Sequence, residues 1–113
     1  MTLRTEALLE TPWPVICRVD RILGRLRWLA ETATTRAAIN PAEFVIEKIT
    51  AEESLAPLPI KQRRILMLGY GEGYTQLEIA LLLGSSVRTI VYHHAAALKR
   101  LARVEMARAE RAA

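Results

Sequence analysis

The chain has 113 residues, of which 51% are hydrophobic and 25% are charged, and its formal net charge is +4 at pH 7. This composition allows a packed core and excludes a disordered chain, and the length suits one small domain with an extension. The single cysteine, Cys17, excludes an intramolecular disulfide. Because the sequence has no signal-like segment and no apolar run of about eighteen residues, we expect a cytoplasmic protein that does not enter a membrane.

The first half of the chain predicts two or three helices. After the proline-containing segment 11–14, apolar residues recur at spacings of three and four, as on an amphipathic helix. This apolar stripe consists of Val15, Ile16, Val19, Ile22, Leu23, Leu26, Leu29 and Ala30. A second helix is predicted to begin at Asn40–Pro41, because asparagine caps helices and proline is accepted in the first turn. Packing within the chain, pairing with a second copy and binding of another protein are the alternatives for the stripe.

A boundary between two regions is predicted at Ser54–Pro59, where two prolines occur close together. Since the residue before a proline is disfavoured in a helix, we expect Ala56 and Leu58 to lie in an extended connector. We therefore divide the chain into a helical N-terminal region, residues 1–57, and a C-terminal domain, residues 58–113. The first has seven Lys or Arg against eight Asp or Glu, a balance of −1, and the second has nine against four, a balance of +5. Basic charge gathers in the second region, as expected for phosphate binding.

Residues 75–94 predict a helix, a tight turn and a second helix. Thr75 and Glu78 have the spacing of a capping box, in which each side chain bonds the backbone N–H of the other residue. Gly84 is predicted to end the first helix, since glycine adopts the left-handed backbone that an abrupt reversal needs. The inward face of this helix is predicted to contain Ile79, Ala80, Leu82 and Leu83.

The second helix is predicted to begin near Val87, with Ser85 or Ser86 as its cap. The side predicted to pack inward contains Ile90, His94, Ala97, Leu98 and Leu101, with His93 at its margin. The opposite side contains Arg88, Val91, Tyr92, Ala95 and Lys99. This mixture of charge, aromatic edge and small apolar surface is more than exposure to solvent requires. Because the second helix of a helix-turn-helix lies in the DNA major groove, this side is the candidate recognition face.

The segment from Leu58 to Leu101 resembles the C-terminal helix-turn-helix of bacterial sigma factors, region 4, and also the LuxR-type domain. The shared elements are a leading L-P helix, E-I-A, a glycine four residues later, S-x-x-T-I, a closing A-L-K-R-L and a link with Gly69, Gly71 and Gly73. Ser85 departs from these families, which usually place an apolar residue there, and Val91–Tyr92 stands where polar residues are more common. No alternating apolar run joined by a hairpin turn occurs. We expect an all-α chain, with a helical N-terminal half followed by a three- or four-helix helix-turn-helix domain.

The resemblance and the recognition face together imply binding to double-stranded DNA near a promoter, with RNA polymerase or a sigma factor as a further partner. We expect Arg88 to contact a base, most often guanine, and Val91 and Tyr92 to contact a thymine methyl. The other predicted DNA-binding residues are Ser86 and Ala95 and, at phosphates, Thr89, Lys99, Arg100, Arg63 and Arg64.

The sequence leaves several functions open. The first is a transcription regulator, and small chains of this kind also resemble late-gene regulators of bacteriophages. The second is a phage packaging or assembly protein, similar to a small terminase subunit, with its helix-turn-helix in an oligomeric ring. The third is a protein-interaction module that docks on RNA polymerase or a sigma factor through Val91, Tyr92 and Ala95. A homodimer suits the first function, because two half-sites one helical turn apart strengthen a weak single contact.

An enzyme is not expected. Residues 69–73, GYGEG, lack the Lys-Ser/Thr ending of a phosphate-binding loop and any preceding strand, so they predict a flexible link between helices. His93 and His94 point about 100° apart on a helix and have no further ligand at metal-binding spacing. Cys17 has no base at a recognisable motif distance. We therefore expect no catalytic residue, no metal and no cofactor.

Overall fold

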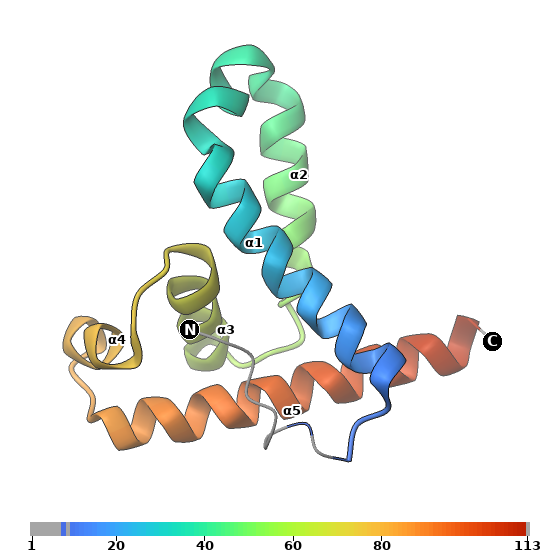
Figure 1. The fold of residues 1–113 in the computed structure, drawn as a ribbon, viewed down its shortest axis with the longest axis vertical. Coiled ribbons are helices and arrows are strands. Elements are labelled where there is room, and N and C mark those ends of the chain that lie inside the picture. Colours follow the sequence, from blue (N-terminus) through green and yellow to red (C-terminus); the bar gives the residue numbers. More distant parts are fainter. Residues whose placement is uncertain (1–7, 9, 113) are drawn as a thin grey trace.

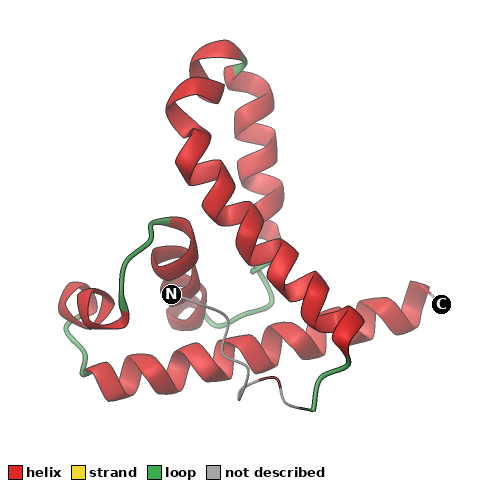
Figure 2. Cartoon of the chain, viewed as in Figure 1, coloured by secondary structure: helices red, strands yellow, loops and turns green. Residues whose placement is uncertain are grey.

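The computed structural model describes residue 8 and residues 10–112, and nearly all of these are helical (Figures 1 and 2). No strand occurs among the described residues, which confirms the predicted all-α fold. The elements in chain order are α1 (Trp13–Ile39), α2 (Pro41–Glu53), α3 (Ile60–Leu66), the π-helical turn η2 (Met67–Gly71), α4 (Gln76–Leu83) and α5 (Val87–Ala112).

Helix α1 is amphipathic and packs its apolar stripe within the chain. It begins at Trp13, slightly earlier than predicted, because Pro14 falls in the first turn, where a missing N–H costs nothing. The buried members of the stripe are Val15, Val19, Leu23, Leu26 and Leu29, whereas Ile16 and Ile22 are half-buried. Ala30 is exposed, because it lines an open cavity between the hairpin and η2.

Helix α2 begins where the sequence predicts and folds back on α1. The Asn40 side chain accepts a hydrogen bond from the N–H of Glu43 at 3.2 Å, which confirms the cap. An ion pair between Arg36 and Glu47 joins the two helices, and the Arg36 guanidinium lies 4.4 Å from the centre of the Trp28 ring. The result is a helical hairpin that projects from the rest of the molecule (Figure 1).

The connector after α2 is a series of turns. The N–H groups of Leu55, Ala56 and Leu58 each bond a carbonyl three residues earlier, at 3.0 Å. The extended connector predicted for Ala56 and Leu58 is therefore wrong. The turns place Leu55 and Leu58 in the core, at 0% and 2% exposure, and burial of these two leucines outweighs the local preference imposed by the prolines.

The glycine-containing link is also shorter than predicted. Gly69 and Gly71 lie in η2, which continues α3 directly, and the N–H of Glu72 bonds the carbonyl of Met67 at 3.1 Å. Only residues 72–75 then connect to α4, and Gly73 has a φ of +79°. The wider π turn keeps Tyr70 in the core at 7% exposure, so tertiary packing extends the helix through the glycines.

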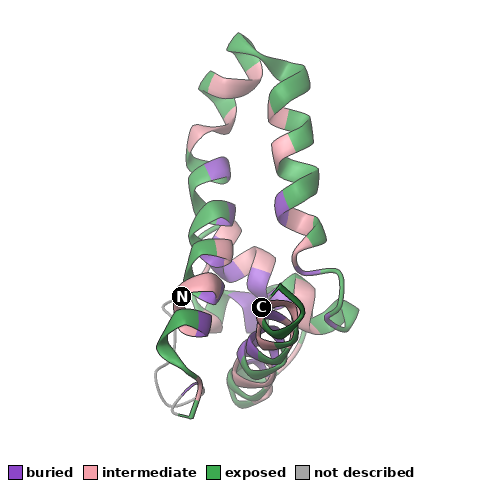
Figure 3. Cartoon of the chain, turned by 90° about the vertical axis from the view of Figure 1, so that its right-hand side faces the viewer, coloured by how far each residue is buried: buried purple, intermediate pink, exposed green. Residues whose placement is uncertain are grey.

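Two apolar clusters hold the helices together. The larger cluster joins α1, the segment after α2, η2 and the middle of α5, and Leu98 and Leu101 are fully buried in it. The smaller cluster joins α3, α4 and the start of α5 through Ile65, Ile79, Ala80 and Ile90. Figure 3 shows buried positions gathered where α5 meets the other helices, while the hairpin is largely exposed towards its tip. Helix α5 therefore takes part in both clusters.

Candidate nucleic-acid interface

The first helix of the helix-turn-helix, α4, begins with the predicted capping box. The Thr75 hydroxyl accepts the N–H of Glu78 at 3.2 Å, and the Glu78 carboxylate accepts the N–H of Thr75 at 3.0 Å. Hydrogen bonding to the Thr75 backbone N–H, and next to the Thr75 side chain, lowers the pKa of the Glu78 carboxyl from its ordinary value. The box fixes where α4 starts and how the chain enters it.

The turn that follows has the geometry the sequence predicts. Gly84 is left-handed, with φ +65° and ψ +33°, and the N–H of Ser85 bonds the carbonyl of Ala80 at 2.9 Å. The Ser86 hydroxyl then accepts the N–H of Thr89 at 3.2 Å, so Ser86 caps α5. Ser85 is half-buried and has no side-chain role in either cap. These hydrogen bonds and the left-handed Gly84 thus set the angle between α4 and α5.

One side of α5 lies in the core. Ile90, His94, Ala97, Leu98 and Leu101 are all 0–1% exposed, as predicted. Nε2 of His94 lies 2.9 Å from the Tyr70 hydroxyl, within hydrogen-bonding distance, and this pair ties the middle of α5 to η2. His93 is half-buried at the margin. Because one side is fully buried, rotation of α5 about its axis is prevented.

The other side of α5 faces solvent. Arg88, Val91, Tyr92 and Lys99 are exposed and Ala95 is half-buried, and these five residues form the recognition face. Tyr92 is 69% exposed, and its ring stands edge-on to the imidazole of His93, with 5.4 Å between the ring centres. Arg88 forms no ion pair with any residue that the structure describes. The guanidinium of Arg88 and the ring of Tyr92 are therefore exposed one helical turn apart on α5.

The structure separates the remaining predicted contact residues into two groups. Arg64 and Arg100 are exposed. Arg63 is half-buried, and its guanidinium donates a hydrogen bond to the carbonyl of Leu58 at 3.4 Å. The hydroxyls of Ser86 and Thr89 lie 2.9 Å apart as part of the α5 cap. Arg63, Ser86 and Thr89 are thus already bonded within the chain.

Arg103 extends the recognition face and was not among the predicted contact residues. It is exposed and lies four residues after Lys99, on the same side of α5 as Arg88. The spacing of three to four residues that identified the earlier members also includes this position. The recognition face therefore carries three cationic side chains, Arg88, Lys99 and Arg103, along about four turns of α5.

Helix α4 differs from the sequence prediction on one side. Leu82, predicted to face inward, is 57% exposed, and Leu77 and Leu81 are 58% and 75% exposed. Ile79 and Ala80 are buried as predicted and Leu83 is half-buried. Since α4 has eight residues and is apolar on every side, its periodicity could not indicate which side meets α5. The three exposed leucines, Leu77, Leu81 and Leu82, are called the α4 leucine patch below.

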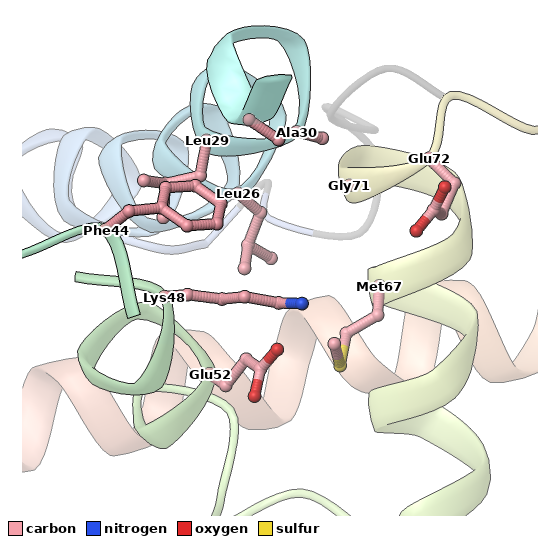
Figure 4. A pocket seen from close by; sticks show the side chains of 10 residues that line it. Leu26, Leu29, Ala30, Phe44, Lys48, Glu52, Met67, Gly71 and Glu72 are labelled. Atoms are coloured by element: carbon pink, nitrogen blue, oxygen red, sulfur yellow. The ribbon is translucent and has the colours of Figure 1, made fainter. Parts of the chain in front are cut away.

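A cavity of about 250 Å³ lies between the hairpin and η2 (Figure 4). Leu26, Leu29 and Phe44 form its apolar wall, and Lys48 extends across it from α2. Within the described part of the chain, no group of three or more His, Cys, Asp or Glu residues could hold a metal ion. None of the helices in that part is long and apolar enough to cross a membrane.

Part of the chain matches a known protein family. Residues 50–101 match the family described as Sigma-70, region 4. This segment is similar to the sigma-70 region 4 helix-turn-helix. It runs from the end of α2 to the middle of α5 and contains both helices around the turn, which confirms the predicted resemblance and supports a DNA-binding, transcription-related role. No curated protein and no solved structure matches the chain.

Proposed function

We propose that this protein is a sequence-specific regulator of transcription that binds duplex DNA near a promoter and acts with RNA polymerase. The observation that carries the proposal is the asymmetry of α5. One side is held in the core by five residues at 0–1% exposure, and the opposite side presents a charged and aromatic face directly after a capped turn. A rigid helix whose exposed side has no packing role suits a major groove.

The recognition face supports a division of roles along α5. Arg88 lies in the first turn, where the guanidinium can bind guanine through two parallel hydrogen bonds. Val91 and Tyr92, one turn later, provide apolar contact with a thymine methyl. Lys99 follows Arg88 by eleven residues, about 16 Å along the axis, so its ammonium suits a phosphate at the groove edge. Arg100 and Arg103 extend this phosphate contact.

The charge distribution supports the same assignment. Residues 58–113 carry a balance of +5, and the exposed cations of α3 and α5 include Arg64, Arg88, Lys99, Arg100 and Arg103. Neutralisation of phosphates by such side chains releases counterions and gives an affinity that falls steeply with salt.

A second candidate, a module that docks on RNA polymerase or a sigma factor, is favoured by the α4 leucine patch. Its three leucines are 57–75% exposed on one short helix. A contiguous apolar surface of this kind is typical of a protein contact. In this case the helix-turn-helix would serve as a scaffold for a protein surface.

An electrophoretic shift assay distinguishes the two candidates. We expect the protein to bind a promoter duplex more tightly than a random duplex, and to bind both less tightly as the salt concentration rises. Substitution Leu81→Glu on the patch should leave this binding unchanged. Failure to shift either duplex at low salt would favour the docking module and contradict DNA binding.

A further inference from the structure

The outer side of the hairpin carries an apolar surface that nothing in the chain covers. Ile39, Val45, Ile46 and Ile49 are 79%, 51%, 65% and 50% exposed, and they are called the hairpin stripe below. The last three lie on one side of α2 at positions i, i+1 and i+4, and Ile39 is the last residue of α1. Three large aliphatic residues thus share one exposed side of α2, and a fourth, Ile39, is exposed where α1 ends at the hairpin tip.

Helix α2 contacts α1 through the opposite side. Phe44 packs against the main core, Ala51 is 7% exposed, and Glu47 pairs with Arg36 of α1. Residues on the side away from α1 would be polar if they faced water permanently. Because that side is aliphatic instead, the hairpin stripe has the composition of a contact surface.

We propose that a second copy of this chain covers the hairpin stripe, so that two molecules associate through their α2 helices. The first argument is charge. The hairpin, residues 13–53, has six Lys or Arg and six Asp or Glu, a balance of zero, whereas residues 58–113 have a balance of +5. A contact through the neutral hairpin keeps the two basic domains apart, and a contact through the helix-turn-helix would bring them together.

The second argument is self-complementarity. In a two-fold dimer the same surface of each subunit meets its copy, so a surface with a charge of one sign at its centre would repel itself. The hairpin stripe consists only of aliphatic side chains, so no charge of one sign lies at its centre. The stripe can therefore pack against its own copy.

The third argument is area. The four residues are 50–79% exposed, and together they expose on the order of a few hundred Å², the size of the largest apolar patches on single subunits. A stable specific interface buries roughly 800 Å² per partner, so the stripe supplies the apolar centre and the residues around it supply the rim. An interface of this size without aromatic anchors is weak, and we expect association in the micromolar range.

Sedimentation equilibrium without DNA tests the proposal, and its outcome is independent of the proposed DNA-binding function. For the natural chain the mean mass should rise with concentration from the 12.7 kDa of one chain to twice that value. The double substitution Ile46→Glu with Ile49→Glu should raise the dissociation constant more than tenfold, so that the mass stays at that of one chain. Both residues are at least half exposed, so the variant should keep its helical circular dichroism.

A control is Leu81→Glu, which changes a leucine on the α4 leucine patch that is more exposed than either isoleucine. This variant should associate like the natural chain. Association that is lost in Leu81→Glu and kept in the double variant would overturn the proposal, as would a natural chain that stays at 12.7 kDa at millimolar concentration. A mass of eight or more chains would also overturn it and would favour a ring of the packaging type.

Discussion

The hairpin and the helix-turn-helix are both built from amphipathic helices, but different kinds of interaction fix their geometry. In the helix-turn-helix, a capping box, a left-handed glycine and a serine cap each bond residues close in sequence. In the hairpin the Asn40 cap sets where α2 starts, but the position of the hairpin on the rest of the molecule depends on contacts of α1 with η2 and α5. Local hydrogen bonds therefore position α5 relative to α4, whereas burial of leucines that are distant in the sequence positions the hairpin.

The largest expected effect comes from the core that the two regions share. Leu101 is fully buried in the cluster that joins α1 to α5, so Leu101→Ala should lower the free energy of unfolding by about 2–5 kcal/mol. Urea unfolding followed by tryptophan fluorescence reports on the hairpin, because both tryptophans, Trp13 and Trp28, lie in α1. Circular dichroism reports on all helices.

Both signals should give the same midpoint in the natural chain and the same reduction in the variant. The control Ile60→Ala changes an exposed residue and should alter stability by less than about 0.5 kcal/mol. Two separated transitions in the natural chain would show that the hairpin and the helix-turn-helix unfold independently, contrary to this prediction.

The next effect concerns the recognition face. Arg88→Ala should weaken binding to the preferred duplex by about 1–3 kcal/mol and reduce the preference over random duplex. Lys99→Ala should weaken binding to both duplexes by similar factors, because a phosphate contact carries no sequence information. Competition binding at fixed salt measures both. Arg111→Ala, an exposed change in the last turn of α5, is the control. Equal losses on both duplexes for Arg88→Ala would remove Arg88 from base contact.

Replacement of glycine by alanine should have a smaller effect on stability, and the effect should have opposite signs in the two regions. Gly84 has a φ of +65°, which a side chain disfavours, so Gly84→Ala should destabilise the protein by about 1–2 kcal/mol. Gly24 lies inside α1 with nothing within 4 Å of an added Cβ, so Gly24→Ala should stabilise it by about 0.5–1 kcal/mol. Thermal unfolding should therefore give a lower melting temperature for Gly84→Ala and a higher one for Gly24→Ala than for the natural chain. A stabilising Gly84→Ala would contradict the turn geometry described here.

The smallest effect is a pH dependence at the start of α4. Because the folded-state pKa of Glu78 lies below its ordinary 4.5, the carboxylate stabilises the folded state above that pH. This contribution should be lost as the pH falls below 4.5 through the folded pKa. Glu78→Gln should therefore show a shallower loss of melting temperature over this range, and an unchanged slope would show that the capping box contributes no pH dependence.

The sequence predicted most of the helix-turn-helix because its signals are local. Thr75, Gly84 and Ser86 occupy the cap and turn positions that their side-chain chemistry favours, and the two sides of α5 follow from a long, regular pattern. The sequence was less informative for short or uniformly apolar segments. In α4 it could not indicate that Leu82 faces solvent, and through Gly69 and Gly71 it predicted a link where the helix continues.

The sequence by itself therefore determined the all-α class, the cap and turn residues and the orientation of α5, since each rests on bonds or periodicity within a few residues. Only the tertiary structure decided that the α1 stripe packs on η2 and α5, that Leu55 and Leu58 enter the core through turns, and that the hairpin stripe remains exposed. Whether an apolar side of a helix is buried depends on contacts with segments that are distant in the sequence. A local sequence pattern carries no information about those contacts.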